Sequence, residues 1–420
     1  MSLGKDYIFK SQTKKQLLIL FASGILLTVV GVFMIINGDG HHEEVSTIAS
    51  ESSHYEFHWY QRFFSNLWIN NVYFTGISVS AVFFLTIQYV AQAGWSAGLI
   101  RVPIAMGSWL PYAFILMLLV FGVANHDIFH WTHEYLYDVN DYRYDAVIDG
   151  KKAYLNVPFY LSRMILFFII WYLLYVMIVK ESDKEDINGG ETHWRKMFTI
   201  SAVFVVVYAV TSSVAAWDWI LSIDTHWFST MIGWYVFASW WVSSLAFITL
   251  IVIALKENGN LDFINHSVIH DLGKFVFAFS VFWTYIWFSQ YLLIYYAHIP
   301  EETIYYVERV KSGIYAPFFY LNLICNFFFP FLFLMTRASK RHTRFLKIAC
   351  PIILFGHFID FYLMVTPGVL KENGGFGFME IGILVVYLSS FLFVVLRSLS
   401  SRRLVPKNHP MLEESLHHDV

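Results

Sequence analysis

The sequence predicts an all-α polytopic membrane protein with ten transmembrane helices, and three observations support this fold class. Of the 420 residues, 57% are hydrophobic and 14% are charged, whereas soluble domains carry about 45–50% apolar and about 25% charged residues. The mean hydropathy is +0.53. Long apolar runs recur along the chain, each able to cross a hydrocarbon core of about 30 Å as a helix. This composition excludes a soluble enzyme and a disordered protein, and a net charge of −3 excludes a basic surface for nucleic acid.

Ten apolar runs define the expected spans. Backbone groups in lipid must bond within their own segment, so runs of this length form helices, whereas barrel strands would show about ten residues of alternating polarity. The spans cover residues 17–37, 70–94, 102–125, 156–179, 197–221, 229–255, 272–298, 314–336, 345–366 and 378–398. We expect one membrane domain over 17–398, with segments 1–16 and 399–420 outside the membrane.

The distribution of Lys and Arg predicts the orientation of these spans. Most of the 28 Lys and Arg residues fall on one side when the N-terminus is placed inside. Positive charge marks the cytoplasmic side, so we expect both termini in the cytoplasm of a bacterium and the spans in its inner membrane. The first span is longer than a typical signal-peptide core and no A-x-A site follows it, which favours an uncleaved span.

The third span ends in a segment rich in histidine. His126 and His130 are four residues apart, a spacing that places two imidazoles on one face of a helix, and Asp127 and Glu134 lie nearby. A zinc site needs a convincing third ligand, which is missing here. We therefore expect His126 and Asp127 to conduct protons or to contact a quinone, and we expect no metal.

Charged residues in the fourth and fifth spans are costly to bury and are candidates for function. Arg163 lies about seven residues into the fourth span and needs an acidic partner, either Asp218 near the outer end of the fifth span or Asp360 in the ninth. Such a pairing would weaken the acid as a base. Asp224 and His226 lie in the short hairpin that follows, where Asp224 is either a functional acid or an N-cap of the next helix.

The ninth span carries His357 and Asp360, three residues apart on one helix face. This pair suits a proton relay, or equally a polar contact that joins two helices. The segment Asp-Phe-Tyr-Leu from Asp360 resembles Asp-Trp-Ile-Leu from Asp218. The similarity predicts parallel repeats over about 70–221 and 229–366.

The candidate residues gather toward the outer half of the expected membrane domain. Only His357 lies well inside a span, so a haem held by two histidines is not expected, and the two cysteines cannot build an iron–sulfur cluster. No ring of like groups suggests a channel. The prolines lie near span ends rather than at the midplane break that is typical of transporters. An apolar, aromatic pocket with an acid or histidine suits quinol chemistry.

Four sequence blocks carry a family resemblance. They are QYVAQAGW at 88–95 with RVP at 101–103, WDWILSIDTHWFST at 217–230, SVFWTYIWFSQY at 280–291 with IPEE at 299–302, and HFIDFYLMVTP at 357–367. Together they resemble the NrfD/polysulfide-reductase-type membrane subunits of alternative complex III, the bacterial quinol:cytochrome c oxidoreductase. Within that family the chain resembles the smaller of the complex's two such subunits.

The resemblance implies two four-helix bundles, spans 2–5 and 6–9, flanked by peripheral spans 1 and 10. It implies a subunit with no covalently bound cofactor that supports menaquinol oxidation or proton translocation. Haem c and Fe–S clusters would lie in partner subunits, namely a multihaem cytochrome c and an Fe–S protein beside a sister NrfD-like subunit, with cytochrome oxidase reached through the complex. Two alternatives stay open: a stand-alone proton-coupled secondary transporter and a purely structural anchor subunit.

Overall fold

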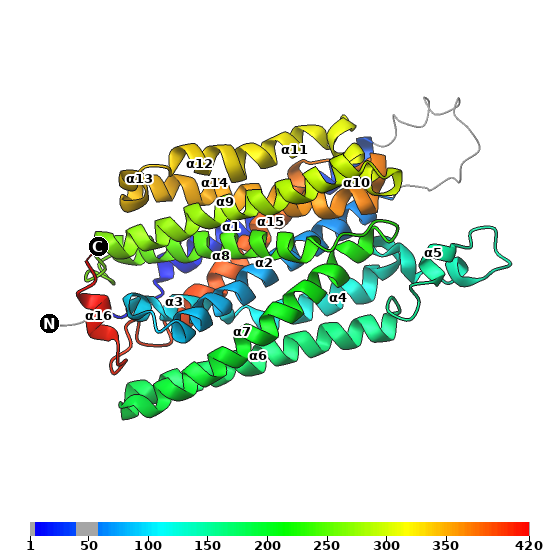
Figure 1. Cartoon of the computed structure of the whole chain (residues 1–420). Helices are drawn as coiled ribbons and strands as arrows, with labels where there is room; N and C mark the ends of the chain where they lie inside the picture. The colour runs from blue at the N-terminus through cyan, green and yellow to red at the C-terminus, as the bar shows by residue number, and fades with distance from the viewer. Residues whose placement is uncertain (1–4, 39–57, 420) are drawn as a thin grey trace.

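The computed structural model describes residues 5–38 and 58–419, and helices dominate this part of the chain. Ten helical segments are long and apolar enough to cross a membrane, and the described residues form no strand. The predicted fold class, an all-α polytopic membrane protein with ten spans, is confirmed. The long helices lie side by side along one common direction (Figure 1).

The spans are α1, α2, α3 with α4, α6, α7, α8, α9, α11 with α12, α14 and α15. Their bounds are Ser11–Gly38, Trp59–Val90, Arg101–Gly107 with Leu110–Ile128, Val157–Asn188, Glu191–Trp219, Ile232–Glu257, His266–Ala297, Ala316–Leu323 with Phe329–Phe333, Thr343–Leu370 and Phe378–Leu399. The short helices are α5, α10, α13 and α16, with bounds Ala146–Asp149, Pro300–Lys311, Arg337–Arg341 and Leu412–Leu416.

Helix α2 is the central helix of the described structure. It packs against α4, α7, α8, α14 and α15, and 94% of its most apolar window is buried. The helix begins at Trp59, well before the predicted start at residue 70, because Ser65, Asn66 and Asn70 are buried against protein rather than lipid. Hydropathy alone reads such polar residues as a loop.

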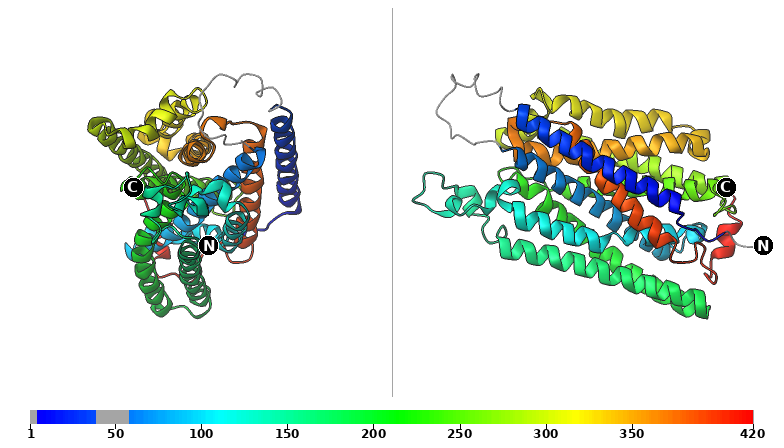
Figure 2. Two further views of the ribbon diagram at one scale, coloured as in Figure 1. Left: turned by 90° about the vertical axis from the view of Figure 1, so that its right-hand side faces the viewer. Right: turned by 180° about the vertical axis from the view of Figure 1, so that it is seen from behind.

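Helices α1 and α15 pack against each other along their length, and α1 lies at the periphery of the helix assembly (Figure 2). Helices α6 and α7 pair in the same way, as do α8 and α9. Because α2 also contacts α8 and α14, the spans form one continuous assembly. The grouping into two four-helix bundles stays a prediction.

Both described chain ends lie at one end of the helix assembly, which we call the terminal face (Figure 1). The backbone N–H of Lys5 donates to the Asn260 carbonyl over 3.3 Å, and His418 contacts Asp271 over 2.5 Å. The other end, with α5 and α10, is called the opposite face. An even number of spans places both termini on one side, as the structure does.

The eighth span is interrupted by a π-helix between α11 and α12, over Ile324–Phe328. Pro330 lacks an N–H group and cannot bond the carbonyl of Asn326 four residues before it, which loosens the helical ladder at this point. Single-turn π-helices are often found at functional sites. Pro330 lies near the end of the predicted eighth span, as expected, but the irregular turn before it lies well inside that span.

Candidate functional site

The first buried acid, Asp218, is bound by a guanidinium group. Arg163 of α6 donates through Nε to Asp218 Oδ2 over 2.7 Å and through Nη2 to Oδ1 over 2.9 Å. Its third nitrogen, Nη1, donates to the Tyr154 carbonyl over 3.2 Å. Asp218 is 1% exposed. Of the two acids predicted as partners of Arg163, the structure pairs it with Asp218, whose carboxylate is compensated by a bidentate cation.

The second buried acid, Asp360 of α14, is held by neutral donors. Asn322 Nδ2 donates to Oδ1 over 2.9 Å, and the Tyr235 hydroxyl donates to the same oxygen. Ser239 Oγ and Trp283 Nε1 donate to Oδ2 over 2.6 and 3.0 Å. Asp360 is 0% exposed. Among the described residues no lysine or arginine pairs with it, so Asp360 carries its hydrogen bonds without a compensating cation.

His357 lies one turn before Asp360 on the same face of α14, as its spacing predicts. Its Nδ1 is 3.9 Å from Asp360 Oδ2, and both side chains are 0% exposed. Within the described part of the chain neither ring nitrogen has a hydrogen-bond partner.

The two acids occupy matching positions in their halves of the chain. Each takes a partner from the span just before its own: Arg163 is the seventh residue of α6 and Asn322 the seventh of α11. Both of these helices carry proline as their second residue. The matched positions favour the predicted repeat. Asn322 follows its proline at the same distance as Arg163 follows its own, and this spacing could have identified Asn322 from the sequence.

Asp360 lies further from the end of its helix than the predicted span, which ends at residue 366, suggests. Helix α14 continues through Pro367 to Leu370, which places Asp360 about 15 Å from the helix end at 1.5 Å per residue. Pro367 leaves the Leu363 carbonyl without its helical donor. Arg309 of α10, only 2% exposed, donates to that carbonyl through Nε over 2.8 Å. A short helix at the opposite face therefore completes the spanning helix that carries the acid.

The histidines after the third span do not share a helix face. Helix α4 ends at Ile128, so His126 is helical and His130 begins a separate 3₁₀ turn; the expected i, i+4 pair is wrong because the helix stops between them. The His126 ring instead lies 5.1 Å from that of His133. Burial, followed by the nearby histidines, lowers the pKa of His133 to about 4. Asp127, at the last turn of α4, lies beside Gln61 of α2.

The hairpin after α7 places its candidates away from both buried acids. His226 Nε2 contacts Asp145 Oδ2 over 2.6 Å, and the His226 side chain is 56% exposed. Asp224 does not cap the next helix, because α8 begins at Ile232 with Met231 at its N-cap. Asp224 and His226 thus belong to the surface of the opposite face rather than to the membrane interior.

A second buried ion pair was not predicted. Arg62 of α2 binds Glu380 of α15 over 2.7 and 2.9 Å, and the Glu380 side chain is 0% exposed. Glu380 also accepts from the backbone N–H of Gly377 over 2.7 Å, which closes the first turn of α15. Its place at a helix start made Glu380 resemble an ordinary first-turn acid.

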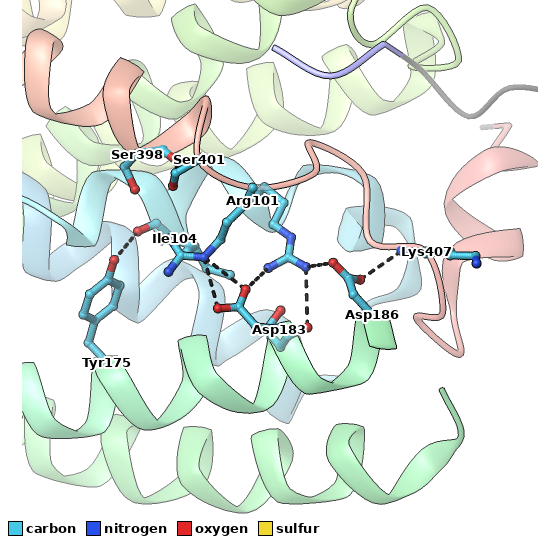
Figure 3. Close-up of polar contacts among 10 residues, drawn as sticks. Arg101, Ile104, Tyr175, Asp183, Asp186, Ser398, Ser401 and Lys407 are labelled. Carbon is cyan, nitrogen blue, oxygen red and sulfur yellow. Dashed lines mark hydrogen bonds and ion pairs between the residues drawn. The ribbon is translucent and has the colours of Figure 1, made fainter. Parts of the chain in front are cut away.

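A fourth charged cluster lies at the terminal face (Figure 3). Arg101, 3% exposed, contacts Asp186 and lies 3.6 Å from Asp183. The C-terminal segment closes over it: Arg402 Nε donates to Asp183 over 3.0 Å, and the Lys407 N–H donates to Asp186 over 3.0 Å. In the sequence, the acidic residues at the end of α6 resemble a helix end exposed to water, so the sequence did not predict this cluster.

The end of the C-terminal segment binds the same face further along. Ser415 Oγ donates to the Trp95 carbonyl over 2.9 Å and accepts from the Gly98 N–H over 3.1 Å. The segment 400–419, expected to be a simple tail, is therefore a docked strap. Its contacts join the end of α6, the 3₁₀ turn Gly94–Leu99 before α3, and the start of α9.

Comparisons with known proteins add no relative: no protein-family model matches the chain, and no curated protein matches it. Within the described residues, no group of three or more His, Cys, Asp or Glu is placed to hold a metal ion. The arrangement of the two acids is therefore the strongest guide to chemistry. Asp218 is paired with a permanent cation, Arg163, whereas Asp360, beside His357, is held within the described part of the chain by neutral hydrogen-bond donors.

Proposed function

We propose that this chain is an NrfD-type membrane subunit of a bacterial quinol:cytochrome c oxidoreductase, alternative complex III, and that it moves protons through Asp360. Asp360 takes up and releases a proton at a carboxylate oxygen, and His357 is the adjacent group that exchanges it. Asp218 with Arg163 holds the corresponding helices of the other half together. The quinol is the substrate of the assembled complex.

One observation carries this proposal: among the residues that the structure describes, the carboxylate of Asp360, deep in a span, has four neutral donors and no paired lysine or arginine. Protonation of Asp218 would leave the buried guanidinium group of Arg163 without its counter-charge, which is costly. Hydroxyl donors such as Tyr235 and Ser239 can rotate to accept or donate, so they tolerate both protonation states of Asp360. The histidine without partners supplies a second site for the proton.

Redox centres belong to partner subunits in this proposal. Cys325 and Cys350 are both buried and free, and the histidines near the opposite face belong to different turns rather than to one set of ligands. Haem c and Fe–S clusters would come from a multihaem cytochrome c and an Fe–S protein that bind at the opposite face. That face is periplasmic if the terminal face, rich in Lys and Arg, is cytoplasmic.

Purification under mild detergent tests the assignment to a complex. The full chain with an affinity tag is isolated from its own membranes, and the absorption spectrum and subunits are recorded. We expect c-type haem absorption and an iron–sulfur protein in stoichiometric amounts. Isolation of the chain alone, under conditions that keep other respiratory complexes intact, would exclude this assignment.

Replacing Asn322, which binds Asp360, by arginine, the residue type that binds Asp218, tests the role of Asp360. Asn322→Arg would give Asp360 the cation that Asp218 has, and should abolish proton movement in the assembled complex. Asp360→Asn should have the same effect without a new charge. A complex that assembles and moves protons at the normal rate with Asp360→Asn would show that this acid is structural.

A stand-alone proton-coupled transporter is the second candidate, favoured by the π-helix Ile324–Phe328. Transporters often place their ion sites at an irregular helix within the membrane. Here the interrupted span carries Asn322, which binds Asp360, and Asn326, which donates to Asn322 over 2.5 Å. Proton-coupled solute uptake by the isolated chain in liposomes would favour this candidate over the subunit.

A further inference from the structure

A groove of about 910 Å³ runs from the terminal face into the membrane interior, between α15 on one side and α8 and α14 on the other. This volume is within the range of about 300–1,000 Å³ that is typical of ligand sites. One wall is a stripe of leucines on α15, which repeat every fourth residue and so share one helix face: Leu384, Leu388, Leu392 and Leu396.

The other wall is apolar and aromatic. It includes Phe247 of α8 and Leu354 and Phe358 of α14. At the deep end the hydroxyl of Tyr73 is already used, because it donates to the Leu354 carbonyl over 2.8 Å. The groove therefore offers hydrocarbon contacts over most of its length and few free polar groups at depth.

The mouth of the groove at the terminal face is positively charged. Lys5 and Lys10 line it, against the single acid Asp6. Within the described part of the chain neither lysine forms an ion pair with a carboxylate. Two contacts hold this segment over the groove: the Lys5 N–H donates to the Asn260 carbonyl over 3.3 Å, and the ring of Phe9 packs on Phe393 at 5.4 Å.

We propose that the groove binds one anionic phospholipid, with its phosphate group at Lys5 and Lys10 and an acyl chain along the leucine stripe of α15. A charged phosphate pairs with ammonium groups more strongly than a neutral quinone head would. Basic pockets between spans on the cytoplasmic side are suited to such headgroups. This inference is independent of the proposed redox and proton functions.

Native mass spectrometry of the purified full chain tests the site. The delipidated protein is incubated with phosphatidylglycerol or with phosphatidylcholine of identical acyl chains. We expect phosphatidylglycerol to be retained about 25-fold better, since each of the two lysines near the headgroup adds about a fivefold preference. Equal retention of the two lipids, or recovery of a quinone in place of a phospholipid, would overturn the proposal.

Two variants separate the headgroup site from the acyl-chain site. Lys5→Gln with Lys10→Gln should remove the preference for phosphatidylglycerol, whereas Lys184→Gln with Lys407→Gln, which changes the same charge elsewhere on this face, should keep it. Leu388→Trp fills the groove and should reduce the retention of both lipids. Because Lys5 and Lys10 are exposed, their replacement leaves the fold intact, and an unchanged preference in that variant contradicts the site.

Discussion

Asp218 and Asp360 show how the surroundings of a single residue decide what a buried acid can do. Both are almost fully buried near the end or middle of a long helix. Arg163 gives Asp218 two charge-assisted hydrogen bonds, so removing the charge of either partner leaves the other uncompensated. Within the described residues, Asp360 accepts from neutral donors alone, two of which are hydroxyl groups that can reverse direction. The first arrangement favours stability and the second favours a change of protonation.

Arg163→Gln should lower the stability of the protein strongly. It leaves the Asp218 carboxylate buried without its cation, which costs about 3–5 kcal/mol in comparable buried pairs. The thermal unfolding temperature in detergent measures the loss. Arg163→Met combined with Asp218→Asn removes both charges and should restore most of it; equal unfolding temperatures for the wild type and Arg163→Gln would show that the pair contributes little.

At the scale of elements, short segments complete the long helices. Helix α10 inserts Arg309 against the carbonyl that Pro367 leaves free in α14, and the strap 400–419 covers charged helix ends at the terminal face. Neither segment is apolar enough to appear as a span. Each satisfies polar groups that a helix in lipid cannot satisfy alone.

Arg309 and Pro367 should be coupled in a double-mutant cycle. Arg309→Met removes the donor to the Leu363 carbonyl and should cost about 1–3 kcal/mol, the penalty for an unmade buried hydrogen bond. Pro367→Ala restores the helical N–H to that carbonyl, so it should reduce the cost of Arg309→Met. Strictly additive losses of thermal stability would contradict this account.

The strap should detach as the pH falls. Burial, followed by the nearby Arg101 cation, lowers the pKa of His409 to about 4, against about 6.5 in an unfolded chain. The undocked strap therefore binds a proton that the docked strap excludes between these values. Docking is fully stable above about pH 6.5 and weakens as the pH falls toward about 4.

Limited proteolysis of the strap measures this pH dependence. Cleavage between 400 and 419 should be faster near pH 5 than near pH 7, and His409→Gln should flatten the profile. A cleavage rate that does not change with pH in the wild type, or that changes equally in His409→Gln, would contradict the role of this histidine.

For the whole molecule, hydropathy predicts the ten spans because each span needs about 20 predominantly apolar residues to cross the hydrocarbon core. It misses the start of α2, whose asparagines face protein, and the π-helix of the eighth span, which Pro330 loosens locally. The need of Arg163 for an acid is predictable, because a buried cation requires one, but the choice of Asp218 over Asp360 is not. The donors to Asp360 are not, because Tyr235, Trp283 and Asn322 lie on three different helices and meet only through tertiary packing.

The orientation of the molecule gives a prediction at this scale. Lys407 lies on the terminal face and Lys152 on the opposite face, so Lys407→Cys and Lys152→Cys each add one thiol to a known face. The native cysteines are buried. A membrane-impermeant maleimide added to intact spheroplasts should label Lys152→Cys alone, since the positive charge places the terminal face in the cytoplasm. Labelling of Lys407→Cys without permeabilisation would reverse the orientation.

The central claim is that Asp360 changes its protonation state while Asp218 does not. Infrared difference spectroscopy of the protein in nanodiscs, recorded across a pH titration, detects the carbonyl band of a buried protonated carboxyl directly. Glu185 of α6 is a further buried carboxyl, so all variants carry Glu185→Gln, which removes it. In that background we expect a titrating band that persists when Arg163→Met and Asp218→Asn are combined and disappears in Asp360→Asn. A titrating band that survives in Asp360→Asn, or a wild-type protein with no such band, would contradict the account.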